Sequence, residues 1–231
     1  MAASISTAEL TRQLASAQRV LVLGGLAVVA HGHSRPTYDA DVWLDPTLSV
    51  EKWSDVLLKL IDQPFLSIIS IGNWHPISAK DLPRLAEEDG VVRIMGANQP
   101  LDVFRKPNEL PMEEFDRVWD FGIPLDDGTR IPDVIDLLVT KQDTGRTKDT
   151  QDIAYLEAKA EEQYLAELPY ASAEKAALML ERFLTPKIAE AALIHLEKPI
   201  QELDRRFLLE LAADGDPFAA EIVRTHRLAE S

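Results

Sequence analysis

The sequence contains no cysteine and has few basic residues for its length of 231. The absence of cysteine excludes disulfide bonds, a thiolate nucleophile and thiolate metal ligands. Lys and Arg number 24 against 39 Asp and Glu, which gives a formal charge of −15 at pH 7, and the acidic residues are spread evenly along the chain. Because affinity for nucleic acid comes mainly from cationic side chains on phosphates, this balance argues against non-specific nucleic-acid binding.

Long apolar runs are also missing. The longest, over 20–30, contains two glycines and falls well short of the ~20 residues that a membrane span requires. The N-terminal segment has neither the basic nor the apolar part of a secretory signal. We therefore expect a soluble cytoplasmic protein with no membrane partner.

An apolar fraction of 46% and a charged fraction of 27% are typical of globular domains. Strand and helix patterns alternate from residue 19 to 131, which indicates a mixed sheet with helices packed on it. From Pro132 onward the spacing of apolar residues is helical throughout. The sequence therefore predicts an α/β (α+β) fold, with a small mixed-sheet domain over 1–131 and an all-helical domain over 132–231.

The individual elements follow from the same periodicities. Strands are expected over 19–23, 38–44, 65–71, 91–95 and 101–104. Helices are expected over 7–15, 26–30, 51–61 and 113–119 in the first domain, and over 133–142, 150–168, 173–184, 188–197 and 200–213 in the second.

Two aspartates of the second expected strand are the strongest candidates for chemistry. Side chains alternate across a strand, so Asp39 and Asp41 share one face. Two carboxylates so close repel each other unless something neutralises them. Mg²⁺ suits this position because it takes one or two carboxylates together with substrate phosphates. Upstream, Gly24 and Gly25 lie between a strand and a helix, where bare backbone N–H groups can meet a phosphate chain.

A third acid has a similar setting. Asp102 lies between Leu101 and Val103 in another short apolar strand. Alternation turns the two apolar neighbours toward the core, and Asp102 toward the opposite face. The alternative is an ordinary exposed strand residue.

These residues together resemble a known family. Gly24-Gly25, thirteen further residues and then Asp39-Ala-Asp41-Val look like the signature of the DNA polymerase β-like nucleotidyltransferase superfamily, in which a third Asp, matched by Asp102, lies on a later strand. The pattern Arg35-x-Thr37-x-Asp39-x-Asp41 resembles the one typical of a prokaryotic branch that includes abortive-infection toxins of the AbiEii type.

A second segment adds to this resemblance. It runs from 136 to 152 and reads Asp-Leu-Leu-Val-Thr-Lys141, four residues, then Arg146-Thr-Lys148-Asp149, two residues and Asp152. In that branch a helix carrying a Lys precedes Arg-x-Lys-Asp-x-x-Asp at the start of the helical domain. The resemblance covers roughly 20–156.

The resemblance implies a catalytic domain over 1–131 that is a Mg²⁺-dependent nucleotidyltransferase, with toxin–antitoxin or abortive infection as its setting. Asp39, Asp41 and Asp102 would be the catalytic residues and would hold two Mg²⁺ ions, with Mn²⁺ as an alternative. A nucleoside monophosphate would pass from an NTP, with ATP expected, to a hydroxyl acceptor: a tRNA, a protein or a small molecule. A cognate antitoxin would be a partner.

The same resemblance implies nucleotide contacts from Gly24, Gly25, Arg35, Thr37 and Lys141. Three of them have a plainer reading. Lys141 fits a solvated helix lysine equally well, Thr37 could fix the strand by a side-chain hydrogen bond, and Arg35 could pair with an Asp of the triad.

Residues outside these candidates have simpler interpretations. Lys148 and Asp152, spaced i and i+4, read as a helix-surface ion pair. His31 and His33 read as structural or solvent-facing, since no third ligand is nearby and Mg²⁺ prefers oxygen.

Two other functions compete, and a Walker-type nucleotide site is excluded. A catalytically silent partner with the same fold would bind nucleotide or regulate another protein, although the presence of all three acids argues against decay of the site. A glycosyltransferase that uses Asp-x-Asp is a minor alternative, since only one strand and one short helix precede Asp39. A Walker loop is absent because no Gly-Lys-Ser or Gly-Lys-Thr follows the glycines.

Overall fold

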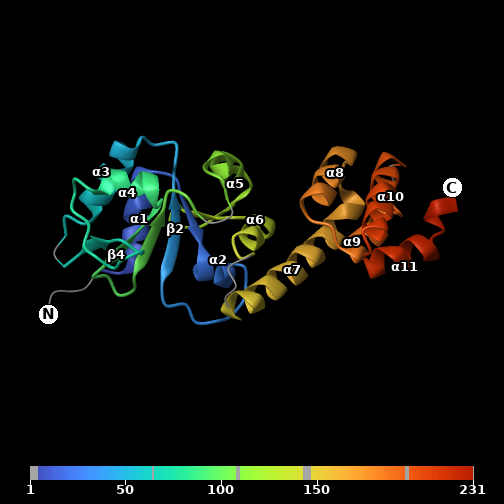
Figure 1. Ribbon diagram of the computed structural model, residues 1–231, viewed down its shortest axis with the longest axis horizontal. Helices are drawn as coiled ribbons and strands as arrows, with labels where there is room; N and C mark the ends of the chain where they lie inside the picture. The colour runs from blue at the N-terminus through green and yellow to red at the C-terminus, as the bar shows by residue number, and fades with distance from the viewer. Residues whose placement is uncertain (1–4, 64, 108–109, 143–146, 196–197, 231) are drawn as a thin grey trace. The chain divides into compact units, whose positions relative to one another are not determined.

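The computed structural model describes residues 5–63, 65–107, 110–142, 147–195 and 198–230. The chain forms two compact units, Met1–Ala154 and Tyr155–Ser231. The first contains a sheet with helices on both faces, and the second is helical (Figure 1). The predicted fold class, a mixed sheet followed by a helical part, is confirmed.

The sheet has seven strands in the order β3-β4-β5-β2-β1-β7-β6. Their bounds are β1 Val20–Leu23, β2 Ala40–Leu44, β3 Ser67–Ile69, β4 Val91–Met95, β5 Leu101–Phe104, β6 Ile123–Pro124 and β7 Arg130–Ile131. Strand β2 is antiparallel to β1 and parallel to β5, so β2 lies inside the sheet with a neighbour on each side.

One face of the sheet is apolar and is covered by α1 (Thr7–Ala17), α3 (Val50–Leu60) and α4 (Leu82–Glu88) (Figure 1). Helix α1 begins where the Ser6 hydroxyl accepts a hydrogen bond from the backbone of Glu9. Its buried Leu10 and Leu14 lie one turn apart on the side that packs inward.

The opposite face carries α2 (Gly24–Ala30), α5 (Phe115–Phe121), which follows the short turn η1 (Met112–Glu114), and α6 (Val134–Val139). Phe115 and Val118 of α5 pack against Leu21, Leu23 and Trp43 in one buried cluster. The Trp43 and Phe115 rings meet edge to face at 4.9 Å. Helix α5 therefore covers part of this face and leaves the remainder for a site.

The segment after residue 131 belongs to the first compact unit in the structure, whereas the sequence placed the domain boundary between 131 and 132. Val134, Ile135, Leu137 and Leu138 of α6 are buried. His31 Nε2 lies 2.9 Å from the carbonyl oxygen of Pro132 and hydrogen-bonds to it. These contacts attach the start of the helical region to the sheet.

The second unit is built from the rest of α7 (Thr147–Glu167), which spans the division, and from the helices that follow. These are η2 Leu168–Tyr170, α8 Ala173–Arg182, α9 Pro186–Ala192, α10 Lys198–Ala213, α11 Pro217–Thr225 and η3 Leu228–Glu230. Ala189, Leu208 and Ala219 form its described core cluster. None of the helices in the described ranges has the length and apolarity needed to cross a membrane.

Several elements differ from the sequence prediction. Helix α2 begins at Gly24, directly after β1, rather than at residue 26. Helices α4 and α11 and the two-residue strands β6 and β7 were not predicted, and β3 is shorter than the expected strand. Strands of two residues show no alternation, so periodicity cannot detect them.

Candidate active site

A row of side chains crosses four neighbouring strands on the partly covered face. Leu23 of β1 lies opposite Asp41 of β2, Asp41 opposite Asp102 of β5, and Asp102 opposite Arg93 of β4. Residues that lie directly opposite each other in a sheet point to the same face. Asp41, Asp102 and Arg93 are therefore neighbours in the sheet, although Asp41 and Asp102 are 61 positions apart in the sequence.

The adjacent row on the same face is apolar. It consists of Leu21, Trp43, Phe104 and Val91, again in direct register. Phe115 packs over this row. This row is buried at Leu21 and Trp43 and partly exposed at Phe104 and Val91, so the covered core ends within it.

A cavity of about 950 Å³ opens over the polar row. All eight residues that the sequence singled out line it: Gly24, Gly25, Arg35, Thr37, Asp39, Asp41, Asp102 and Lys141. They come from α2, the segment before β2, β2, β5 and the segment that follows α6. The fold thus brings every predicted site residue to one cavity.

The two glycines make room for polar side chains. A Cβ on Gly24 would lie 1.8 Å from Oδ2 of Asp41, and Gly24 has a φ of +58°. A Cβ on Gly25 would lie 2.8 Å from Oγ1 of Thr37 and 2.9 Å from Nη2 of Arg35. Side chains at these positions would displace the residues that line the cavity, and at Gly24 the backbone conformation also disfavours them.

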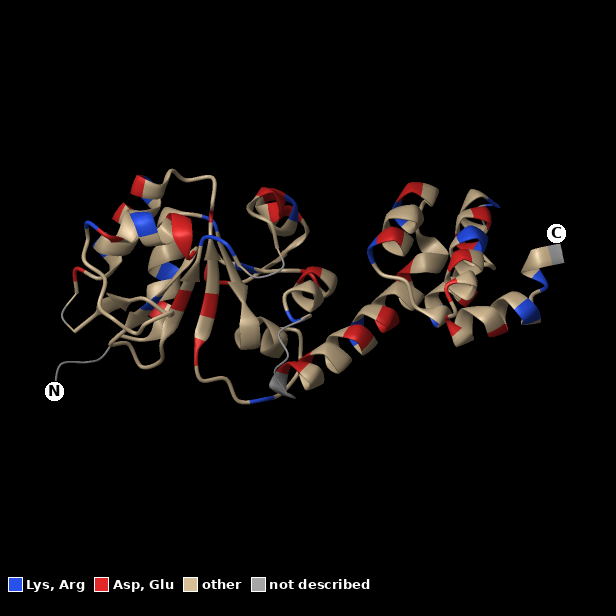
Figure 2. Ribbon diagram, in the orientation of Figure 1, with Lys and Arg blue, Asp and Glu red and all other residues tan. Residues whose placement is uncertain are grey.

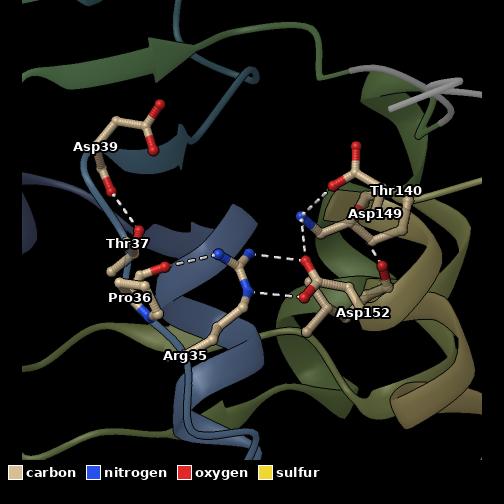
Figure 3. A network of polar contacts seen from close by, with 9 residues as sticks. Arg35, Pro36, Thr37, Asp39, Thr140, Asp149 and Asp152 are labelled. Atoms are coloured by element: carbon tan, nitrogen blue, oxygen red, sulfur yellow. Dashed lines mark hydrogen bonds and ion pairs between the residues drawn. The ribbon is translucent and has the colours of Figure 1, made fainter. Parts of the chain in front are cut away.

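The segment before β2 is held by hydrogen bonds. Thr37 Oγ1 donates to the carbonyl oxygen of Asp39 at 3.0 Å (Figure 3), and Gln99 Nε2 donates to the carbonyl oxygen of Thr37 at 3.2 Å. The Asp39 side chain remains 35% exposed. Thr37 therefore fixes the backbone next to Asp39, as one of its two readings from sequence predicted.

Asp102 is engaged by an arginine that the sequence analysis did not single out. Arg93 Nε donates to Oδ1 of Asp102 at 2.6 Å, and Arg93 Nη2 donates to Oδ2 at 2.7 Å. Hydrogen bonding to Asp102 raises the pKa of Arg93, with the charges of Asp39 and Asp41 adding to the effect against the cost of burial. The available signal was a lone charge in the apolar run Val91-Val-Arg93-Ile-Met95.

Arg35 faces Asp152 in a buried ion-pair network (Figure 3). Arg35 Nη2 donates to Oδ2 of Asp152 at 2.7 Å, and Arg35 Nε lies 2.7 Å from Oδ1. Lys141 Nζ lies 3.2 Å from Asp152 and 3.4 Å from Asp149. Asp152 is fully buried, so its reading as a surface ion-pair partner of Lys148 is wrong. The side chain of Lys148, and Arg146 altogether, lie outside the described residues.

The charges of the described site do not balance. Five carboxylates, from Asp39, Asp41, Asp102, Asp149 and Asp152, lie with three cationic side chains, from Arg35, Arg93 and Lys141. The formal charge is −2. Acidic residues are distributed over both units (Figure 2), so this excess is notable because three of its acids, Asp102, Asp149 and Asp152, are buried.

The Mg²⁺ ion that the resemblance implies fits part of this donor set. Asp39 and Asp41 present carboxylates to the cavity, and the Asp41 carboxylate lies where a side chain on Gly24 would be. One or two carboxylates with substrate phosphates are the usual protein ligands of Mg²⁺. Asp102 fits less well, because each of its oxygens already accepts a hydrogen bond from Arg93, whose positive charge offsets that of the carboxylate. Within the described ranges, no group of three or more His, Asp or Glu side chains is arranged to hold a metal.

Comparisons with known proteins add little to this geometry. No protein-family model matches the sequence, and no curated protein matches it. Among solved structures, the chain is similar to a protein of H. pylori described as a "putative nucleotidyltransferase", with a TM-score of 0.39 and 16% identity over 96% of this chain and 93% of the other. A similarity at this level establishes no function for the chain.

Proposed function

We propose that the chain is a Mg²⁺-dependent nucleotidyltransferase that moves a nucleoside monophosphate from an NTP to a hydroxyl group. The observation that supports this proposal is the gathering of the Asp39, Asp41 and Asp102 carboxylates on one cavity, with Gly24 leaving room for the Asp41 carboxylate. Among the described residues that line the cavity, four carboxylates and three cationic side chains give a formal charge of −1, which favours a divalent cation over a bare nucleotide. The same cation would then attract the phosphates.

Each residue has a role in this proposal. Asp39 and Asp41 would hold the ion. When bound, the ion would supply positive charge that offsets the negative charge developing on the phosphate oxygens. Thr37 fixes the backbone at Asp39. Gly24 and Gly25 line the phosphate path. The two ions that the resemblance implies would require Asp102 as a further ligand. Mn²⁺ can replace Mg²⁺ in binding experiments.

Arg35 and Lys141 are the candidate cationic contacts for the phosphates of the nucleotide. Both line the cavity, and both contact Asp152. In the proposal their remaining donors approach the triphosphate while the carboxylates hold the two cations in position. Without those carboxylates, two long flexible side chains would have to be ordered on binding, at a cost in conformational entropy.

The cavity volume is compatible with a nucleotide. Its ~950 Å³ lies at the upper end of the ~300–1,000 Å³ that small-molecule sites occupy. We propose ATP as the nucleotide and leave the acceptor open among a tRNA, a protein hydroxyl and a small alcohol.

Incubation with Mg²⁺ and each of the four α-labelled NTPs, with cell extract as the acceptor pool, tests the proposal. We expect label transfer and pyrophosphate release, both lost in the paired variant Asp39→Asn/Asp41→Asn. Asp55→Asn, an exposed acid on α3, is the matched control and should retain activity. If the unchanged chain neither binds a nucleotide with Mg²⁺ nor releases pyrophosphate, the proposed function is wrong. Binding without transfer would instead identify the silent partner.

The toxin role is a separate part of the proposal and comes from the resemblance to the AbiEii-type branch. It places the chain in the cytoplasm, with a cognate antitoxin as its partner. Induced expression should then arrest growth of the host, and the Asp39→Asn/Asp41→Asn variant should not. Growth arrest by both proteins would separate toxicity from nucleotidyl transfer.

A further inference from the structure

Arg93 lines the cavity and contacts three other side chains. Asp102 accepts two hydrogen bonds from it, Asp39 Oδ2 lies 3.9 Å from Nη2, and the ring of Trp74 lies 5.2 Å from the guanidinium carbon. The Arg93 side chain is 16% exposed. Its guanidinium is therefore held in place by an acid and an aromatic ring before any ligand binds.

The interaction between Arg93 and Asp102 is a strong and directional one. Two parallel N–H···O bonds between a guanidinium and a carboxylate fix both the distance and the plane of the pair. The Asp102 side chain is only 7% exposed, so solvent screens the pair weakly. For Asp102 to bind a metal, the ion would have to approach a carboxylate that already holds a cation, and the two positive charges would repel each other.

Arg93 has donors that Asp102 does not use. Nε and Nη2 contact Asp102, whereas Nη1 donates to none of the residues that the structure describes. Arg93 lines the same cavity as Asp39 and Asp41. A guanidinium with unused N–H groups beside a cavity matches the oxygens of a phosphate.

The spacing suits a phosphate chain. Arg93 and Asp41 lie on strands separated only by β5, and neighbouring strands are about 4.8 Å apart, so their backbones are about 10 Å apart. Both side chains point to the same face. A triphosphate bound to a cation at Asp39 and Asp41 could therefore place an oxygen within reach of Arg93.

We propose that Arg93 contacts a phosphate of the nucleotide and that Asp102 positions Arg93 instead of ligating a metal. This inference rests on the proposed function and assigns a catalytic residue that the sequence analysis missed. It also changes the role of the third acid: Asp102 is a positioning residue, and the fixed cation it holds offsets negative charge on the phosphates as they react.

The two readings of Asp102 predict opposite results in metal binding. We would titrate the chain with Mn²⁺ alone, and then titrate the Mn²⁺-loaded chain with α,β-methylene-ATP, which cannot transfer its nucleotidyl group. The variants are Asp102→Asn, Arg93→Gln and Asp41→Asn. Arg84→Gln, a surface arginine paired with Glu88 on α4, is the matched control.

If Asp102 positions Arg93, Asp102→Asn should change the affinity for Mn²⁺ by less than about two-fold, whereas Asp41→Asn should weaken it by about tenfold or more. Asp102→Asn and Arg93→Gln should each weaken binding of the analogue by about tenfold, and the double variant should be no worse than either, because the two residues act as a unit. Arg84→Gln should behave like the unchanged chain.

If Asp102 is a metal ligand, Asp102→Asn should lose Mn²⁺ as Asp41→Asn does, and Arg93→Gln should bind Mn²⁺ more tightly because a competing cation is gone. That result would overturn the inference and leave the proposed function intact. A chain that binds neither Mn²⁺ nor the analogue would overturn both. Should Arg93→Gln fail to fold, Arg93→Lys keeps a cation beside Asp102 but loses the two-point contact, and unimpaired analogue binding by it would also overturn the inference.

Discussion

A buried acid in the helical unit provides a quantitative test of the structure. Asp204 of α10 is 0% exposed, and neither of its carboxylate oxygens accepts a hydrogen bond from the described residues. Burial raises the pKa of Asp204 from 3.8 to about 8. The carboxyl group is therefore neutral in the folded chain at pH 7 and ionised in the unfolded chain.

This difference makes stability depend on pH in a defined direction. Between pH 3.8 and about 8, the folded chain holds one proton more than the unfolded chain at this group, so stability falls as the pH rises through that window. At ~1.4 kcal/mol per pKa unit, the penalty at pH 7 is about 4 kcal/mol. Most of it is absent at pH 4, because that pH is close to the value of 3.8 and the unfolded chain is then only partly ionised at this group.

Asp204→Leu, which replaces the carboxyl with an apolar group of similar size, should remove the penalty. We expect the variant to exceed the unchanged chain by up to ~4 kcal/mol at pH 7 and by much less at pH 4. Urea denaturation followed by circular dichroism between pH 4 and 8.5 measures the difference. Asp204→Asn, which cannot ionise, is the control and should show the same flattened pH dependence. A difference that is constant with pH, or that grows on acidification, would refute the reasoning.

Three further substitutions test the site and the helices. Gly24→Ala should displace the Asp41 carboxylate, which lies 1.8 Å from the added Cβ, and should lower both Mn²⁺ affinity and the melting temperature, with a backbone cost of ~1–2 kcal/mol. Asp152→Asn should destabilise the chain by about 3 kcal/mol in urea denaturation, because it removes the buried charge that Arg35 contacts at two points. Asp216→Ala should cost ~1 kcal/mol, since the carboxylate caps α11 by accepting hydrogen bonds from two backbone N–H groups; an unchanged melting temperature would contradict it.

Local patterns predicted the placement of Asp41 and Asp102, whereas Asp39 lies just before β2, which begins at Ala40, and not inside the expected strand. Alternation within β2 and β5 places Asp41 and Asp102 opposite the buried residues on either side of them, and the parallel register of those strands brings them together. The apolar residues around each acid decide which face is buried. A carboxylate within such a strand can then only point to the other face.

Pairings between distant segments could not be predicted in the same way. Arg35 and Asp152 are 117 residues apart, and the spacing of Asp152 from Lys148 offered a nearer partner by the i, i+4 rule. The local rule failed because it considers only the surface of one helix. Burial of α7 at Asp152 depends on where the chain folds back, which no local periodicity contains.

The pairing of Arg93 with Asp102 shows what a strand pattern can and cannot specify. An arginine inside β4 had to point away from Val92 and Ile94, which are buried, so its face was predictable. Its partner was not, because a shift of the β4–β5 register by two residues keeps every face and changes every pair. Register therefore decides whether Asp102 meets a cation of the chain or is left to bind a metal ion. The resemblance could suggest a third acid at this position, but only the neighbouring strand determines what that acid does.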